Sequence, residues 1–277
     1  MSDKADSFCV MTSGVFTAAY LALVPLLEAM TGKGIVTLTT SIGTGETSIP
    51  SRLARSEPVD LVIVAEPNMQ RFVQQGYILA DTRTLIAKSS VAIAVREGEP
   101  PPDASCADAL RRTLLRARTI AYSASESGKY LTTQLYQRLG IHEQCLPKSV
   151  FVGNGERTGA VVARGEADIA FQQISELRPV KGIAHITPIP PELQATVWVA
   201  AGVPVWSRNV ELARSVVRFL GSADAAAAIE QSGLELVGCV PDAVPYSSPE
   251  AAIAPAEAVN VDLAVDLTTS IPKPAVL

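Results

Sequence analysis

Short apolar runs alternate with segments of helical length along most of this chain. Runs rich in β-branched residues and of strand length lie at 8–11, 35–40, 60–65, 85–87, 91–95, 119–122, 149–152, 168–171 and 196–201. Between and after them, helices are predicted at 15–31, 49–55, 69–75, 106–116, 129–139, 157–164, 210–220 and 223–232. This alternation predicts an α/β protein with parallel sheets, whose ligands bind at the carboxyl ends of the strands.

Two segments depart from this pattern. Residues 98–103 contain three consecutive prolines and predict a loop. Beyond residue 240 the chain is rich in proline and alanine, and we expect residues 241–277 to form an extended tail that is partly ordered at most.

Composition narrows the function classes. The 277 residues allow one large or two medium α/β domains, and a net charge of −5 with 5% aromatic residues argues against a nucleic-acid partner. His142 and His185 are the only histidines, which disfavours a histidine-rich zinc site and a serine–histidine hydrolase. We therefore expect neither a metal nor a cofactor.

The four cysteines are far apart and form no C-x-x-C pair. We expect Cys9, Cys106, Cys145 and Cys239 to be reduced and mostly buried, with a Cys106–Cys145 disulfide as the alternative.

The first six residues carry two acids, and only a short apolar run follows them. A secretory signal has a basic start and about 7–15 apolar residues, and a membrane span has about 20. We therefore expect a cytoplasmic protein without a membrane span, and a periplasmic one if a leader has been removed.

A strand followed by small hydroxyl residues, glycine and a helix occurs three times. The junctions contain Ser13 and Gly14, then Ser41 and Thr44, then the segment 123–130. Free backbone N–H groups at a helix start, together with hydroxyls, can hold an anion. The alternative is that Ser13, Ser41 and Thr44 only cap helices, and that the serines of 123–127 form a polar loop.

The segment Gly-Glu-Ala-Asp-Ile-Ala-Phe at 165–171, with Val-Asp-Leu-Val-Ile at 59–63 before it, resembles a known family. Together with the opening strand-Ser-Gly-helix, it is similar to the type 2 periplasmic-binding-protein fold, in the subgroup of the bacterial molybdate-binding proteins. The resemblance extends from about residue 8 to 240. It implies two lobes, each a mostly parallel sheet flanked by helices: 1–87 plus 195–240, and 88–194. The ligand would lie in the cleft between them.

The resemblance also implies ligand contacts from both lobes. The residues that it places at the ligand are Ser13, Gly14, Ser41, Thr44, Ala65, Ser123, Ser125, Ser127, Gly128, Gln172 and Gln173. Arg157, which opens a helix after Gly-Asn-Gly, is a further candidate, with a solvated surface arginine as the alternative.

The chain departs from the molybdate binders after the 165–171 segment. Their strand is commonly followed by a segment with a tyrosine, whereas Gln172 and Gln173 stand here. Lys129 adds a charge that a cage of neutral donors does not need. Amide and ammonium donors suit a carboxylate. The fold family includes aconitate isomerases, and this chain is similar to that branch.

Three residues are the candidates for catalysis. Glu66 follows an apolar strand and would act as a base if burial raised its pKa, while Lys129 and Tyr130 follow the serine-rich junction. The plain alternatives are a helix-start carboxylate for Glu66 and an exposed lysine for Lys129.

Two functions remain open. The first is an isomerase that moves a C=C bond in an unsaturated di- or tricarboxylate by an allylic proton shift. The second is the solute-binding protein of an ABC importer for molybdate or another small oxyanion or carboxylate. The expected partner is a small anionic ligand, with a homodimer through the tail as a hypothesis and a permease only if a leader peptide precedes the sequence.

Overall fold

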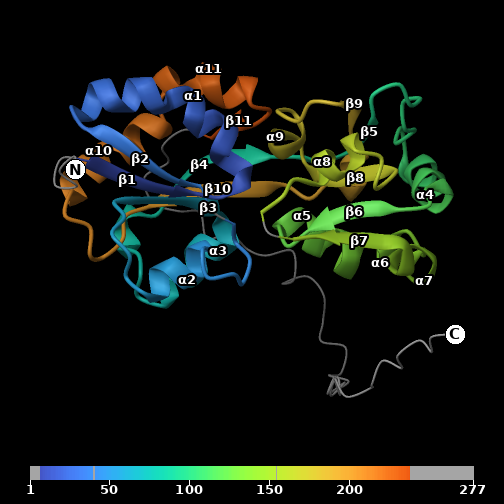
Figure 1. Ribbon diagram of the computed structural model, residues 1–277, viewed down its shortest axis with the longest axis horizontal. Coiled ribbons are helices and arrows are strands. Elements are labelled where there is room, and N and C mark those ends of the chain that lie inside the picture. The colour runs from blue at the N-terminus through green and yellow to red at the C-terminus, as the bar shows by residue number, and fades with distance from the viewer. Residues whose placement is uncertain (1–6, 40, 154, 238–277) are drawn as a thin grey trace, which may run out of the picture. The chain divides into compact units, whose positions relative to one another are not determined.

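Two sheets, each covered by helices on both faces, carry the fold in the computed structural model, which describes residues 7–39, 41–153 and 155–237 (Figure 1). The first sheet has the order β11-β4-β10-β3-β1-β2. Its strands are β1 (Ser7–Thr12), β2 (Gly34–Thr39), β3 (Leu61–Ala65), β4 (Thr84–Ser89), β10 (Val197–Gly202) and β11 (Glu235–Leu236). We call this sheet with its helices the first lobe.

The second sheet has the order β7-β6-β8-β5-β9. Its strands are β5 (Val91–Arg96), β6 (Ile120–Ser123), β7 (Ser149–Val152), β8 (Ile169–Gln173) and β9 (Ile183–Pro188). We call this sheet with its helices the second lobe. The predicted two-lobed α/β fold is confirmed, whereas the lobe boundaries at 88 and 194 stay a prediction and the tail at 241–277 lies outside the described residues.

Both sheets are mostly parallel, with one reversed strand inserted inside each. In the first lobe β1, β2, β3 and β4 run in one direction, and β10 pairs antiparallel with both β3 and β4. In the second lobe β5 pairs antiparallel with both β8 and β9, whereas β6, β7 and β8 are parallel. The inserted strands are those by which the chain enters the second lobe and returns to the first.

The two connections between the lobes are tied together by one amide side chain. A single residue, Ser90, separates β4 from β5, and residues 189–196 separate β9 from β10. Gln194 accepts a hydrogen bond from Val91 N at 2.7 Å, and its amide nitrogen donates to Val91 O at 3.1 Å and to Ile189 O at 3.3 Å. The crossings are therefore held side by side.

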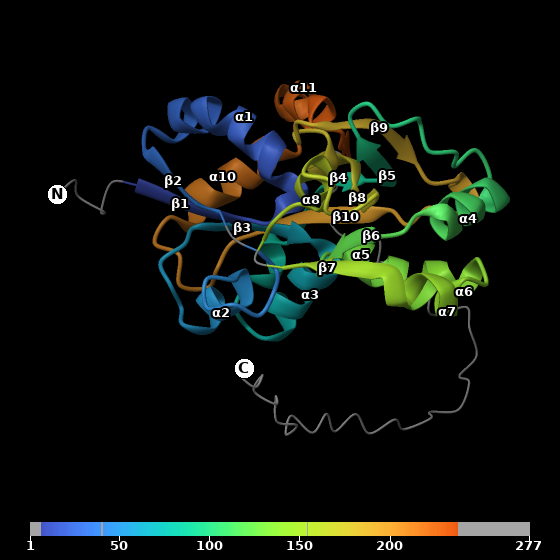
Figure 2. The ribbon, with the colours of Figure 1, turned by 45° about the vertical axis from the view of Figure 1, so that its right-hand side comes forward.

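Helices α1, α10 and α11 cover one face of the first sheet, and α2 and α3 cover the other, as both views show (Figures 1 and 2). Their bounds are α1 (Gly14–Thr31), α2 (Ile49–Ala54), α3 (Glu66–Gln74), α10 (Val210–Leu220) and α11 (Ala223–Gln231), with a 3-10 turn η2 (Ala80–Thr82) before β4. Each face has its own apolar core.

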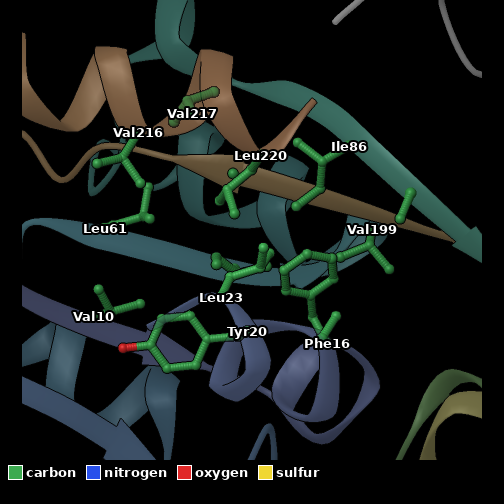
Figure 3. Packing of buried hydrophobic residues seen from close by; sticks show 14 of the residues in the cluster. Val10, Phe16, Tyr20, Leu23, Leu61, Ile86, Val199, Val216, Val217 and Leu220 are labelled. Carbon is green, nitrogen blue, oxygen red and sulfur yellow. The ribbon is translucent and has the colours of Figure 1, made fainter. Parts of the chain in front are cut away.

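Helix α1 contributes most to the larger core. Its residues Phe16, Tyr20 and Leu23 recur at helical spacing and are buried against strands β3, β4 and β10 and helix α10 (Figure 3). The Tyr20 hydroxyl shares a 2.9 Å hydrogen bond with Thr37 Oγ1, which satisfies its polar end. The helix ends at Gly32, whose φ of 64° is left-handed. By length and composition alone α1 could cross a membrane, but its apolar side lies in this core.

The second sheet is covered in the same way. One face carries α4 (Ala107–Arg116), α5 (Glu126–Tyr130), the π-helical η3 (Leu131–Leu135), α6 (Tyr136–Arg138), α7 (His142–Cys145) and the 3-10 turn η4 (Leu146–Lys148). The other face carries α8 (Thr158–Ala163) and α9 (Ile174–Leu177), and a 3-10 turn η5 (Pro191–Leu193) precedes β10. In β5 the small Ala92 and Ala94 face α8, and Val91 and Ile93 face the opposite core.

Several boundaries differ from the sequence interpretation. Helix α3 begins at Glu66 rather than at residue 69, because Pro67 occupies a first-turn position where a missing N–H costs nothing. The helix after β6 begins at Glu126 rather than at residue 129. Strands β9 and β11 were not predicted, since β9 is a half-exposed edge strand and β11 has two residues.

Cys106 and Cys145 are free thiols, so the alternative of a disulfide between them is wrong. Cys145 is buried, Cys9 is partly buried and Cys106 is exposed. Cys239 lies outside the described residues.

Replacement of Gly128 by alanine should destabilise the protein by about 3 kcal/mol, because the added methyl group would lie 1.8 Å from Ser123 O. Replacement of Gly34 is the matched control: a methyl group added there would have no atom of a more distant residue within 4 Å, and we expect a change of at most about 0.5 kcal/mol. Urea unfolding of both variants measures the difference. Equal stabilities would contradict the close approach at Gly128.

Candidate functional site

The start of helix α1 meets a buried carboxylate from the second lobe. Ser13 occupies the N-cap position, but its side chain makes no cap hydrogen bond, and its backbone N–H donates to Ile63 O at 3.0 Å. A Cβ at Gly14 would lie 3.0 Å from Glu176 Oε1 and 3.5 Å from Oε2. The glycine at this position leaves room for the carboxylate of Glu176 at the positive end of the helix dipole.

One amide side chain holds Glu176 in place. The Gln172 carbonyl oxygen accepts hydrogen bonds from Thr158 N at 3.0 Å and from Thr158 Oγ1 at 2.8 Å. Because a backbone N–H can only donate, the opposite end of the amide is the nitrogen, and this nitrogen donates to Glu176 Oε2. Thr158, Gln172 and Glu176 are all buried. They form a closed polar chain from α8 through β8 to α9.

Burial raises the pKa of Glu176 to about 7, and the positive charge of Arg157 opposes this shift without cancelling it. Arg157 lies at the N-cap position of α8 and is half-buried. Within the described part of the chain its guanidinium forms no hydrogen bond and no ion pair. The site therefore combines a carboxylic acid that titrates near neutral pH with a cation whose donors are open to a ligand.

The three serines of the 123–127 segment form a hydroxyl chain. Ser123 Oγ donates to Ser125 Oγ at 3.0 Å, the Ser125 and Ser127 hydroxyls lie 3.0 Å apart, and Ser127 Oγ donates to Gln173 Oε1 at 2.9 Å. Ser125 is the N-cap residue of α5 but makes no side-chain cap hydrogen bond. Gly128 allows the first turn of α5 to approach Ser123 O closely. This chain ends at the amide beside Gln172.

Two further contacts join the lobes, one at Glu126 and one at Ser41. Asn68 Nδ2 of α3 donates to Glu126 Oε1 of α5 at 3.3 Å, and Lys129 Nζ donates to the same oxygen at 2.8 Å. A Cβ at Gly155 would lie 3.5 Å from Ser41 Cβ. The first-lobe loop at Ser41 and the second-lobe loop before α8 are therefore neighbours.

The structure places the predicted catalytic residues in different surroundings. Glu66 is buried at the start of α3, and its Oε1 lies 2.9 Å from Arg83 Nη2. Burial raises the pKa of Glu66, and the charge of Arg83 acts in the opposite direction. The Tyr130 hydroxyl donates to Leu193 O at 2.6 Å, and Lys129 has a half-exposed side chain. The roles predicted for Glu66, Lys129 and Tyr130 stay predictions.

The predicted binding residues divide into three sets. Ser13 and Gly14 lie next to the carboxylate of Glu176. Ser123, Ser125 and Ser127 form the hydroxyl chain that ends at Gln173. Arg157 and Gln172 belong to the polar group at the start of α8. Ser41 Oγ accepts from Gly43 N at 3.3 Å, and Ala65 is the N-cap residue of α3. Thr44 is exposed and lines a first-lobe hollow of about 450 Å³ with residues of α2 and α3, including Arg71. Their ligand contacts stay predictions.

The alternative that the hydroxyls of Ser13, Ser41 and Thr44 cap helices is wrong. Ser48, which the sequence pattern did not mark, caps α2 by accepting from Ser51 N at 3.4 Å, whereas Ser41 and Thr44 lie in the loop before it. Ser13 makes no cap bond despite its N-cap position.

Sequence reasoning missed Glu176 and Thr158. The available signal for Glu176 was its place four residues after Gln172, immediately beyond a buried strand, where a carboxylate on a short helix can reach back to the strand end. No local pattern marks Thr158 as the partner of Gln172.

Among the described residues, no group of three or more histidine, cysteine, aspartate or glutamate side chains could hold a metal ion. The side chains described above supply hydrogen-bond donors and acceptors, charged groups and one buried carboxyl group with a pKa of about 7.

The raised pKa of Glu176 should make folding stability depend on pH. Between the ordinary value of 4.5 and about 7, the folded state binds more protons at Glu176 than the unfolded state does, so this contribution is present below pH 4.5 and is lost as the pH rises to about 7. About 2.5 pH units at about 1.4 kcal/mol each amount to about 3.5 kcal/mol.

The measurement is urea unfolding of wild type and Glu176→Gln across pH 4.5–8. We expect the difference in free energy of unfolding between them to shift in favour of the variant as the pH rises. Glu211→Gln, an exposed carboxylate on α10, is the matched control and should show no such shift. A difference between wild type and Glu176→Gln that does not vary with pH would contradict the burial of a titrating carboxylate.

Comparisons with known proteins show the family to which the chain belongs. Residues 8–235 match the family described as bacterial extracellular solute-binding protein. Aconitate isomerase from a Pseudomonas species is 38% identical over 241 residues, which cover 87% of this chain and 92% of that protein.

Solved structures agree on the fold. The periplasmic molybdate-binding protein of Azotobacter vinelandii superposes with a TM-score of 0.66 at 18% identity, covering 82% of this chain and 98% of that one. The sulfate-binding protein of Mycobacterium tuberculosis superposes with a TM-score of 0.64 at 20% identity, covering 83% and 87%. The predicted resemblance is confirmed: this chain belongs to the bacterial extracellular solute-binding protein family and has its two-lobed periplasmic-binding-protein fold.

Proposed function

We propose that this protein is an aconitate isomerase, which binds the tricarboxylate between its lobes and moves the C=C bond by an allylic proton shift. The observation that carries the proposal is the 38% identity to an aconitate isomerase along nearly the whole length of both chains. The described site supports the ligand class, because its donors suit carboxylate groups.

Each carboxylate of the substrate needs hydrogen-bond donors or a cation once water is displaced. Arg157 offers a guanidinium without a hydrogen-bond partner among the described residues, and planar guanidinium groups bind carboxylates through paired hydrogen bonds. The start of α1 at Gly14 offers backbone N–H groups at the positive end of the helix. The hydroxyls of Ser123, Ser125 and Ser127 donate along their own chain to Gln173, so each would have to rotate to donate to a carboxylate. Lys129, exposed beside Glu126, would meet a carboxylate at the edge of the site.

The reaction requires few parts. A base removes a proton from the carbon beside one carboxylate, the electrons delocalise over the C=C bond into another carboxylate, and the proton returns to the far carbon of the former double bond. Cations and N–H groups that stabilise the enediolate lower the barrier. From the sequence, Glu66, Glu126 or Tyr130 would carry the proton, and Lys129, Arg157 and helix N-termini would stabilise the negative charge. These roles stay predictions.

The second candidate function is that of a solute receptor for an ABC importer, which binds an oxyanion or carboxylate without changing it. The family description and the likeness to molybdate- and sulfate-binding proteins favour it. The two functions imply different locations. The isomerase proposal places the protein in the cytoplasm, and a receptor with its permease partner would work outside the inner membrane.

Incubation of the purified protein with trans-aconitate, followed by proton NMR, tests the choice. We expect cis-aconitate to appear catalytically without added metal or cofactor. Calorimetry with aconitate, molybdate and sulfate gives the second readout. Tight binding of any of these anions without conversion of aconitate would reject the isomerase and favour the receptor.

Replacement of Arg157 by alanine should weaken aconitate binding by about tenfold to a hundredfold, because a charge-assisted hydrogen bond contributes about 1.5–3 kcal/mol. The matched control is Arg164→Ala, which removes an exposed arginine at the other end of α8 that is paired with Glu156 and Glu166. Calorimetry measures both dissociation constants. Equal affinities for the two variants would remove Arg157 from the proposed site.

A further inference from the structure

We propose that Glu176 is the catalytic residue that carries the proton between the two carbons of the substrate, a role that rests on the proposed isomerase function. The inference starts from the position of its carboxylate at the junction of the lobes. Glu176 lies on α9 of the second lobe, and its Oε1 faces Gly14 at the start of α1 in the first lobe.

The two oxygens of this carboxylate have different surroundings. Oε2 accepts the hydrogen bond from Gln172, which is itself fixed by Thr158. Within the described residues Oε1 accepts no hydrogen bond, and it is the oxygen nearer to the point that a Cβ on Gly14 would occupy. One oxygen therefore holds the group in position, and the other is available to take a proton.

The charges around Glu176 are few. Among the described groups, Arg157 at the start of α8 is the charged residue that acts on its ionisation, while Gly14 on α1 and Gln172 on β8 contribute no charge. A buried carboxyl beside one cation ionises near neutral pH, which agrees with its pKa of about 7. A group that must both accept and return a proton works best when its pKa lies close to the working pH.

The step balances without a further reactant. The Glu176 carboxylate removes a proton from the methylene carbon, and the C–H electron pair forms the new C=C bond. The pair of the old C=C bond moves into the carboxylate on its far carbon, which gives an enediolate. The protonated Glu176 then returns the proton to that far carbon. The CH and CH2 carbons have exchanged roles, so trans- and cis-aconitate share one constitution and differ in the geometry about the new double bond.

The same geometry supplies the charge stabilisation. The positive charge of Arg157 acts on Glu176 and partly offsets the rise in pKa that burial causes. The N–H donors of the Arg157 guanidinium bind no described residue, so they can donate to the enediolate. The α1 N-terminus at Gly14 adds the positive end of an 18-residue helix. The proton carrier and the stabilising groups therefore lie together at one place.

The other acid–base candidates are engaged elsewhere. Glu66 forms its ion pair with Arg83 at 2.9 Å. The Tyr130 hydroxyl donates to Leu193 O and also accepts from Arg138 at 2.9 Å, which joins its helix to η5. Glu126 accepts from both Asn68 and Lys129.

The test compares three full-length variants with wild type: Glu176→Gln, Glu176→Asp and Glu66→Gln. NMR of aconitate conversion gives kcat and KM, calorimetry gives the dissociation constant, and circular dichroism reports folding. We expect Glu176→Gln to lower kcat by about 10²–10⁴-fold with affinity within about tenfold of wild type, since the amide keeps the shape but cannot take the proton. Glu176→Asp keeps a titrating group and should retain measurable turnover. Glu211→Gln is the control with unchanged kcat.

The outcomes distinguish failure of the role of Glu176 from failure of the proposed isomerase function. No conversion by the wild type rejects the isomerase itself. With an active wild type, a kcat of Glu176→Gln within about tenfold of the wild-type value overturns the role of Glu176. So does a loss of turnover in Glu66→Gln alone.

If Glu176→Gln does not fold, the pH profiles of wild type and Glu176→Asp test the role of Glu176 instead. We expect the wild-type kcat/KM to rise with pH through a single ionisation near 7 and Glu176→Asp to shift that ionisation. A profile that is flat in this range, or that is unmoved in Glu176→Asp, would overturn the inference.

Discussion

Keeping the carboxylate of Glu176 away from water without a direct ion pair is the constraint on which the rest of the site depends. An isolated buried charge is expensive, and a protein meets the cost by neutralising the group or by surrounding it with oriented donors. Both occur here: the pKa rises towards neutrality, and Gln172 donates to one oxygen. Thr158 must then orient Gln172, and Gly14 must leave space for the carboxylate. Residues on four elements of two lobes are thereby linked.

Much of the fold could be predicted from the chain because its signals are local. Apolar strands that end in serine or glutamine, followed by glycine and a helix, indicate both the α/β class and the ends of the strands where ligands bind. Ser13 and Ser125 do occupy helix starts. The inserted strands β5 and β10 carry no such signal, because strand direction depends on pairing with segments far along the chain.

The candidate site was only partly predictable for the same reason. Gln172 and Gln173 were recognised as amides at the end of a buried strand, but their partners Thr158 and Ser127 lie 14 and 46 residues away. The sequence made a base role for Glu66 conditional on a pKa raised by burial. Burial does raise the pKa of Glu66, but the opposing charge of Arg83 comes from a different element and has no local signal. Glu176 received no role from the sequence, since nothing local shows that α1 would meet it.

The amide of Gln194 has a consequence for how the lobes move. Its hydrogen bonds to Val91 and Ile189 link the two connections, one leading into the second lobe and the other leading back to the first. The two crossings cannot separate at this point without breaking the two hydrogen bonds between Gln194 and Val91, so a movement of one lobe relative to the other would have to bend both crossings together.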